Sequence, residues 1–226
     1  MNDENIWDKD FISDQSLEIL SGVKTAIHEL DLFDEEFKDI FSKDAGVWEK
    51  YTIEEHTLMV LRQFDRYFAG GVFPDGITDE FFRTMFVLHD LGKPMAVKQG
   101  NIKLQHDETV KVVDPILKKL GFSKFEINLI EIIVGNYPIG PYLRYDKIDD
   151  AIFKIKKMIK ESGLSPKDFF AVLLIYYMCD SGSYTSDAGG KPSLEYVFDF
   201  DHENKKLEFS PEYQEKMSEL IELMFN

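Results

Sequence analysis

The chain has 226 residues, of which 44% are hydrophobic and 14% aromatic, enough to bury one sizeable core and too apolar for a disordered chain. A formal net charge of −16 means that most of the surface would repel long nucleic acid. No apolar run approaches the roughly 18 residues of a membrane span, and the single Cys179 cannot form an internal disulfide, so we expect a cytoplasmic protein without membrane contact.

The start of the chain is acidic and is followed by helical segments. Trp7 and Phe11 are expected to pack onto the body of the protein. Apolar residues at three- and four-residue steps predict a helix over 15–32, and a short amphipathic helix is expected over 34–41. His28 has acidic neighbours and is interpreted as a surface histidine.

A capping box marks the beginning of the next helix. Thr52 and Glu55 have the spacing of that motif, so a helix should run from here to about Phe68. His56 lies four residues before Val60, on the apolar face of this helix. The sequence therefore directs an imidazole toward the core.

A His–Asp pair ends the helix predicted over 79–91. His89 shares an apolar face with Phe86, and Asp90 lies at the margin of that face. A buried, uncompensated carboxylate costs several kcal/mol or more, so such groups are normally paired, protonated or bound to a metal. The polar stretch 97–103 that follows is expected to form a small hairpin or a lid over a site.

The second half of the chain continues the helical pattern. Helices are predicted over 105–120, 123–133, about 145–161 and from Ser165–Pro166 onward, a β-hairpin over 195–209, and a last helix after Ser210–Pro211. The apolar stripe of the helix that begins at Pro166 ends in Asp180, which brings a second carboxylate to an apolar face. We therefore expect a mainly α protein with a small C-terminal β-hairpin.

Four polar residues lie on or beside apolar helix faces, at positions that Leu or Phe would usually occupy: His56, His89, Asp90 and Asp180. Taken singly, each has a plain structural explanation, as a core histidine, a helix cap or a surface charge. Together, two imidazoles and two carboxylates form a nitrogen and oxygen donor set that suits Mn²⁺, Fe²⁺, Co²⁺, Zn²⁺ or, less well, Mg²⁺.

The order of these residues resembles the HD-domain superfamily of metal-dependent phosphohydrolases, whose pattern is a His, a His–Asp pair and a distant Asp on successive helices. The matching segments are Glu55–His56–Thr57, Leu88–His89–Asp90–Leu91–Gly92–Lys93–Pro94 and Met178–Cys179–Asp180–Ser181. With Gln105–His106–Asp107 after the Gly-Lys-Pro, the pattern looks most like HD domains attached to tRNA nucleotidyltransferase and poly(A) polymerase enzymes.

The resemblance implies an HD-type helical bundle that holds one divalent metal ion (Mn, Fe, Co, Ni, Zn or Mg) through His56, His89, Asp90 and Asp180. The reaction would be hydrolysis of a nucleotide or another small phosphate ester by a metal-activated water. Catalytic residues would be Asp90, Lys93 and His106, with His106 a further ligand or a proton donor.

Substrate binding would fall to Lys93, His106, Asn136 and Arg144, with a solvated charge at a helix end as the alternative for Lys93. Asn136 stands where relatives with two metals have a further histidine, which favours a single ion. A dinuclear iron oxygenase on the same fold is therefore a weaker alternative. A second alternative is a non-catalytic HD-fold regulatory module that binds a nucleotide or a protein.

Three segments are expected on this basis. Residues 1–50 would form an N-terminal helical extension packed on the core, 51–189 the HD-type metal-binding helical domain, and 190–226 an appendage of hairpin and helix. The sequence does not indicate the natural substrate or the oligomeric state.

Overall fold

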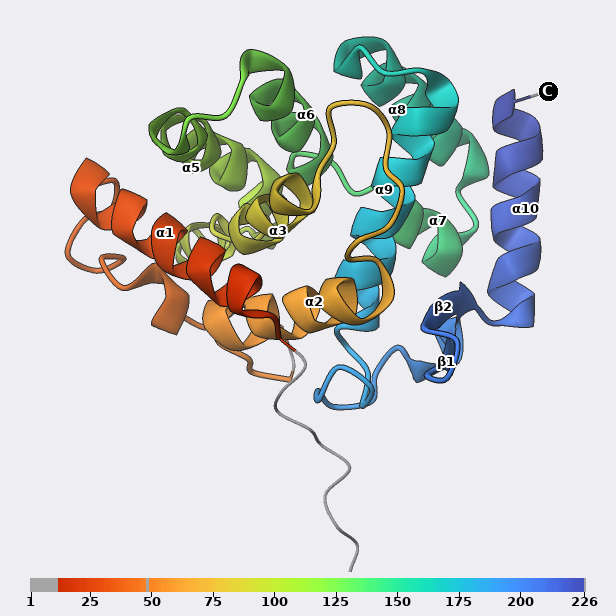
Figure 1. The fold of residues 1–226 in the computed structure, drawn as a ribbon, viewed down its shortest axis with the longest axis horizontal. Helices are drawn as coiled ribbons and strands as arrows, with labels where there is room; N and C mark the ends of the chain where they lie inside the picture. Colours follow the sequence, from red (N-terminus) through yellow and green to blue (C-terminus); the bar gives the residue numbers. More distant parts are fainter. Residues whose placement is uncertain (1–11, 48, 226) are drawn as a thin grey trace, which may run out of the picture.

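The computed structural model describes residues 12–47 and 49–225, so Trp7 and Phe11 lie outside the described residues. The helices are α1 (Asp14–Leu30), α2 (Ile53–Tyr67), α3 (Asp79–Leu88), α4 (Lys93–Lys98), α5 (Gln105–Leu120), α6 (Lys124–Val134), α7 (Ile139–Tyr145), α8 (Ile148–Ser162), α9 (Pro166–Gly182) and α10 (Pro211–Phe225). Strands β1 (Phe198–Asp201) and β2 (Lys206–Phe209) form one antiparallel hairpin (Figure 1). The predicted class, mainly α with a small C-terminal hairpin, is confirmed.

Side-chain caps determine where the helices begin. Thr52 and Ser123 each complete a capping box, and Ser165 accepts a hydrogen bond from the backbone of Asp168 with Pro166 in the first turn. These three starts agree with the sequence prediction because a cap satisfies backbone N–H groups through residues adjacent in the chain.

Several predicted segments differ from the structure. The stretch 34–41 is a series of turns that ends in the 3-10 helix η2 (Ile40–Ser42), which has no side-chain cap. The stretch 97–103 is not a hairpin: it completes α4, which Pro94 opens in its first turn, and enters the 3-10 helix η3 (Ile102–Leu104).

Two helix bounds also change. Helix α3 ends at Leu88, three residues before the predicted Leu91, so His89 and Asp90 occupy the turn after the helix. Helix α7 lies before the predicted start of α8, in a segment too short to show a clear periodic pattern. The α3 difference matters for the site, because a turn lets both side chains of the His–Asp pair face the interior.

The core forms where α2, α3 and α9 pack together (Figure 1). Phe64 of α2 lies 5.3 Å from Phe82 and 5.6 Å from Phe86 between ring centroids, and Phe86 stacks on Tyr176 of α9. Burial of such rings is worth about 1.5–3 kcal/mol each, which makes these helices a rigid frame for residues at their ends.

The described parts of all three predicted segments contribute to one hydrophobic core. Leu20 and Phe41 from the first segment and Leu207 and Leu220 from the last are buried in the same cluster as the central helices. Residues 1–11 of the predicted first segment, like residue 226 of the last, lie outside the described residues.

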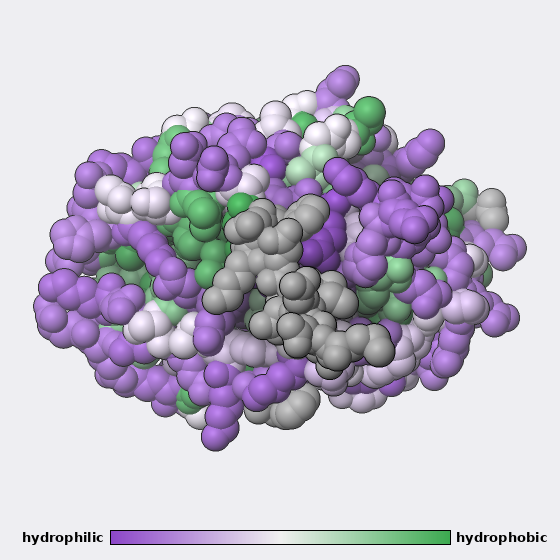
Figure 2. All heavy atoms as spheres, turned by 60° about the horizontal axis from the view of Figure 1, so that its bottom comes forward, coloured by the Kyte–Doolittle hydropathy of each residue, from purple (hydrophilic) through white to green (hydrophobic). Residues whose placement is uncertain are grey.

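The face in Figure 2 carries mostly hydrophilic residues, with hydrophobic ones exposed in small separate areas. Helix α10 and the hairpin lie at the edge of the molecule (Figure 1). Within the described residues, every helix is too short or too polar to cross a lipid bilayer.

Candidate metal centre

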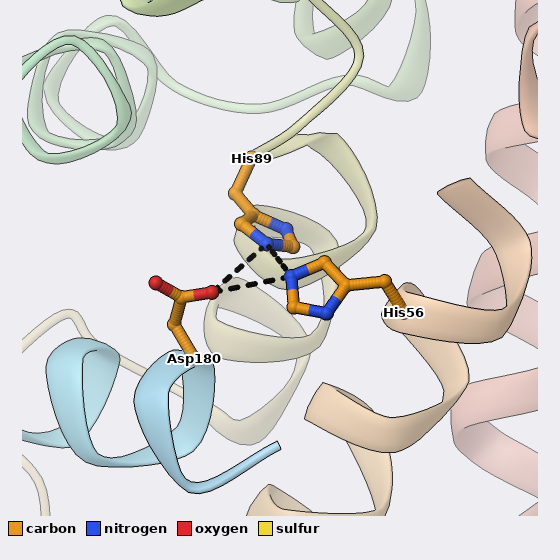
Figure 3. Close-up of side chains that lie close together, drawn as sticks. All are labelled: His56, His89 and Asp180. Carbon is orange, nitrogen blue, oxygen red and sulfur yellow. Dashed lines mark hydrogen bonds and ion pairs between the residues drawn. The ribbon is translucent and has the colours of Figure 1, made fainter. Parts of the chain in front are cut away.

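Three elements distant in sequence bring His56, His89 and Asp180 together, as Figure 3 shows. His56 comes from α2, His89 from the turn after α3, and Asp180 from the last turn of α9. The His56 Nε2 atom lies 3.1 Å from His89 Nε2 and 3.2 Å from Asp180 Oδ1, and His89 Nε2 lies 3.4 Å from that oxygen. All three residues are buried, with at most 8% of their surface exposed.

The turn that carries His89 is held by close backbone packing. The Gly92 N–H donates to the Thr109 hydroxyl at 3.0 Å, and that hydroxyl donates to the Gln105 carbonyl at 2.8 Å. A Cβ on Gly92 would lie 2.2 Å from the backbone nitrogen of Thr109, a distance too short for any non-bonded contact. Gly92 is therefore required so that the turn can approach α5 and direct His89 inward.

Hydrogen bonds on the far side of each imidazole select its tautomer. His89 Nδ1 donates to the Phe86 carbonyl at 2.6 Å. His56 Nδ1 faces the Ser183 hydroxyl at 3.3 Å, and because that hydroxyl donates to the Asp180 carbonyl, its oxygen accepts from His56. Both Nε2 lone pairs then point into the cluster, the orientation typical of metal-binding histidines.

Asp90 adds a second carboxylate to the cluster. Its Oδ2 lies 3.2 Å from His56 Nε2 and 3.4 Å from His89 Nε2, and it contacts the Lys93 ammonium. The same oxygen is fully buried, and the Lys93 ammonium is its cationic partner. All four residues that the sequence singled out as ligands are thus neighbours in space.

Charge, more than burial, sets protonation in the cluster. Burial disfavours the charged form, but His89 and Lys93 hold the pKa of Asp90 well below its usual range. Burial is likewise outweighed at Asp180, where His56 and His89 lower the carboxyl pKa. For His89, burial is outweighed by Asp90 and Asp180, which raise its pKa. In the absence of a metal ion, a proton on His89 would relieve the repulsion among these acceptor atoms.

The donor set fits a divalent ion. Two ring nitrogens and a carboxylate oxygen lie within 4.8 Å of one another, and the buried Asp90 Oδ2, which also contacts Lys93, lies beside both nitrogens. Mixed imidazole and carboxylate sets suit Mn²⁺, Fe²⁺, Co²⁺, Ni²⁺ and Zn²⁺. The buried group of His56, His89 and Asp180 could hold a metal ion.

A cavity of about 540 Å³ opens beside the cluster. Asp90 and Asp180 form part of its wall, together with three of the predicted substrate or catalytic residues: Lys93, His106 and Arg144. Only 12% of the Lys93 side chain is exposed, whereas Arg144 is an exposed residue. The cavity therefore has one cation near the cluster and another in contact with solvent.

His106 and Asn136 occupy different positions relative to this cavity. His106 lines it and its Nδ1 donates to the Val134 carbonyl at 2.9 Å, while burial lowers its pKa. A neutral imidazole with this tautomer presents Nε2 as an acceptor, which suits a ligand or a base better than an acid. Asn136 does not line the cavity; its amide donates to the Ile132 carbonyl at 2.8 Å, and its role in substrate binding stays a prediction.

Sequence reasoning missed several residues of the same cavity. Tyr137 stacks on His106, and its hydroxyl shares a hydrogen bond of 3.1 Å with Ser181. Tyr184 stacks on His56 with 4.8 Å between ring centroids, and Glu49 is a further buried wall residue. No local pattern marks these residues, because loops and helix ends far apart in the chain supply them.

Comparison with protein-family models, with curated proteins and with solved structures returned no match.

Proposed function

We propose that this protein is a metal-dependent phosphohydrolase of the HD type that acts on a small phosphate ester such as a nucleotide. One observation carries the proposal: His56, His89 and Asp180 converge with their acceptor atoms toward a common point, and Asp180 lines a cavity that Lys93 and Arg144 also line. A cation at that point and cations in the wall are the two features that phosphate hydrolysis requires.

The ligand roles follow from the directions of the side chains. His56, His89 and Asp180 would hold the ion, with Asp90 as the fourth ligand because its Oδ2 lies beside both ring nitrogens. When bound, a divalent ion supplies Lewis acidity, which lowers the pKa of a coordinated water and offsets charge on a phosphoryl oxygen. The bonds from the two Nδ1 atoms to Phe86 and Ser183 keep the imidazoles in place.

The remaining wall residues bind and orient the ester. Lys93, which neutralises Asp90 in the structure, is close enough to the cluster to contact a phosphoryl oxygen. Arg144 would contact a more exposed part of the substrate, and its planar guanidinium suits a phosphate. His106 Nε2 would accept a proton from a water or hydroxyl in the cavity.

The size of the cavity restricts the substrate. About 540 Å³ is the volume of a typical small-molecule site and is adequate for a mononucleotide or a sugar phosphate. The net charge of −16 would repel long nucleic acid from the rest of the surface. We therefore expect small esters to be the substrates.

The test is turnover of a panel of phosphate mono- and diesters after chelation and reloading with Mn²⁺, Co²⁺, Ni²⁺, Zn²⁺ or Mg²⁺. Wild-type protein should hydrolyse at least one ester only when loaded. His89→Ala should lose bound metal and activity together, whereas His28→Ala, a change at an exposed histidine of α1, should lose neither. A loaded protein that binds nucleotides but leaves them unaltered would instead support the non-catalytic regulatory module.

A further inference from the structure

Glu49 is a buried residue that lines the cavity and has no ion pair in the part of the chain that the structure describes. Only 4% of the residue is exposed. Within residues 12–47 and 49–225, its carboxylate has neither a hydrogen bond nor a cation at ion-pair distance. Asp90 and Asp180, the other carboxylates of the wall, have histidines or a lysine beside them. Among the described residues of this wall, Glu49 is the carboxylate that has no ion pair with a histidine or a lysine.

The backbone around Glu49 is firmly anchored. The Lys191 ammonium donates to the Glu49 carbonyl at 3.1 Å, and the Lys191 N–H donates to the Tyr51 hydroxyl. An isolated bridge between Asp44 and Thr52 closes the base of the loop. Lys191 is thus bound to the backbone of Glu49 instead of its side chain, and the loop holds Glu49 in the wall.

Glu49 is not part of the metal cluster. The ligand atoms that lie within 4.8 Å of one another in the described residues are those of His56, His89 and Asp180. Glu49 nevertheless adds, after burial and the two aspartates, to the charges that raise the pKa of Tyr184, which stacks on His56. The same cavity is therefore lined by Asp90 and Asp180 of the cluster and by a separate carboxylate, Glu49.

A carboxylate that lines a cavity without a cation beside it is available to pair with a cationic group of a ligand. The negative charge of Glu49 would repel a second phosphate, and a neutral hydroxyl would donate a hydrogen bond but carry no positive charge. An ammonium group supplies both the hydrogen bond and the positive charge. The rings of Tyr176, Tyr184 and Tyr196 line the same cavity, and the faces of aromatic rings attract cations.

We infer that the cavity binds a phosphate ester whose alcohol part carries a cationic amine, with the phosphate at the His56, His89 and Asp180 cluster and the ammonium at Glu49. This inference rests on the proposed function for the phosphate end. It assigns Glu49 as the residue that selects the leaving alcohol.

The experiment compares ligands that differ only in an ammonium or a methyl group at the end of the chain. Turnover is measured with O-phosphoethanolamine and n-propyl phosphate, and binding with the non-hydrolysable aminopropylphosphonate and butylphosphonate. Metal-loaded wild type, Glu49→Gln and the control Glu18→Gln are compared at about pH 8, where an alkyl amine remains charged. Glu18 is an exposed carboxylate of α1, so its variant makes the same charge change away from the cavity.

Wild type and Glu18→Gln should prefer the amine-bearing member of each pair by about tenfold or more, and Glu49→Gln should lose most of that preference. Turnover without an amine preference, or a preference that Glu49→Gln retains, would overturn the role of Glu49 and leave the hydrolase intact. An amine preference in binding without any turnover would overturn the hydrolase alone. Absence of both binding and turnover would overturn both.

Discussion

Replacing Asp180 by Asn tests the metal centre with the smallest change in shape. The amide keeps the volume of the side chain but removes the charge of an oxygen that lies 3.2 Å from His56 Nε2 and 3.4 Å from His89 Nε2. Substitutions that merely misorient a metal ligand cost about 10–100-fold in metal affinity. Loss of the ligand charge itself should therefore cost about 100-fold or more.

The expected effect on stability follows from mass action. An ion at about one hundred times its dissociation constant stabilises the folded wild type by about 2.7 kcal/mol. In a chain of this size that corresponds to a rise in melting temperature of about 5–11 °C. The same ion concentration would be close to the dissociation constant of Asp180→Asn. The ion would therefore stabilise this variant by only about 0.4 kcal/mol, which corresponds to a rise in melting temperature of about 1–2 °C.

The assay is differential scanning calorimetry of chelated protein with and without added Mn²⁺, Co²⁺ or Zn²⁺, with elemental analysis of the same samples. Asp187→Asn is the matched control. Asp187 is also a shielded carboxylate near the end of α9, but it pairs with Arg66 at 2.9 Å and accepts from Gln63. This variant should melt at a lower temperature and still show the full metal-induced rise. A full metal-induced rise in Asp180→Asn, or a wild type that no divalent ion stabilises, would refute the role of Asp180 as a metal ligand.

Three further outcomes are expected. Lys93→Ala should keep the metal-induced rise in melting temperature but lower kcat/KM for p-nitrophenyl phosphate by about tenfold or more, and unchanged kinetics would remove Lys93 from substrate binding. Metal affinity, measured by titration at a series of pH values, should be highest at alkaline pH and should decline as the pH falls through the pKa of His89, which is raised above its ordinary 6.5. The reason is that the metal binds only the unprotonated ring. A metal affinity that does not change over this pH range would contradict the role of His89 as a ligand. Gly140→Ala should displace the Tyr137 ring, because a Cβ would lie 2.1 Å from its Cε1 atom, and should destabilise the fold by about 1–3 kcal/mol in chemical denaturation. Gly22→Ala, where nothing lies within 4 Å of the new Cβ, is its control, and equal stability of the two variants would refute the packing argument.

Local signals were sufficient for much of the fold. The capping boxes at Thr52 and Ser123 and the Ser165–Pro166 pair predicted helix starts that the structure confirms. The hairpin between β1 and β2 followed from alternation around a polar turn. Each of these signals works because the residues that satisfy the backbone lie within a few positions of it.

Short segments were predicted poorly for the converse reason. The stretch 34–41 has the composition of an amphipathic helix, yet it forms turns whose conformation depends on burying Phe37, Ile40 and Phe41. Helix α7 has only seven residues, and the hydroxyl of its buried Tyr142 donates to the Lys216 carbonyl of α10. Helices this short are marginal by themselves, so tertiary contacts decide them.

The sequence by itself determined which residues are candidates for the metal centre. His56, His89, Asp90 and Asp180 are polar residues at buried positions, where an apolar side chain would avoid the free-energy cost of desolvation. It could not determine that the two Nε2 atoms come within 3.1 Å of each other, or that Glu49 shares a cavity with them. Those facts depend on how α2, α3 and α9 pack and on loops that close over their ends. Helical periodicity specifies which face of a helix is buried, whereas only the packed tertiary structure specifies what that face meets.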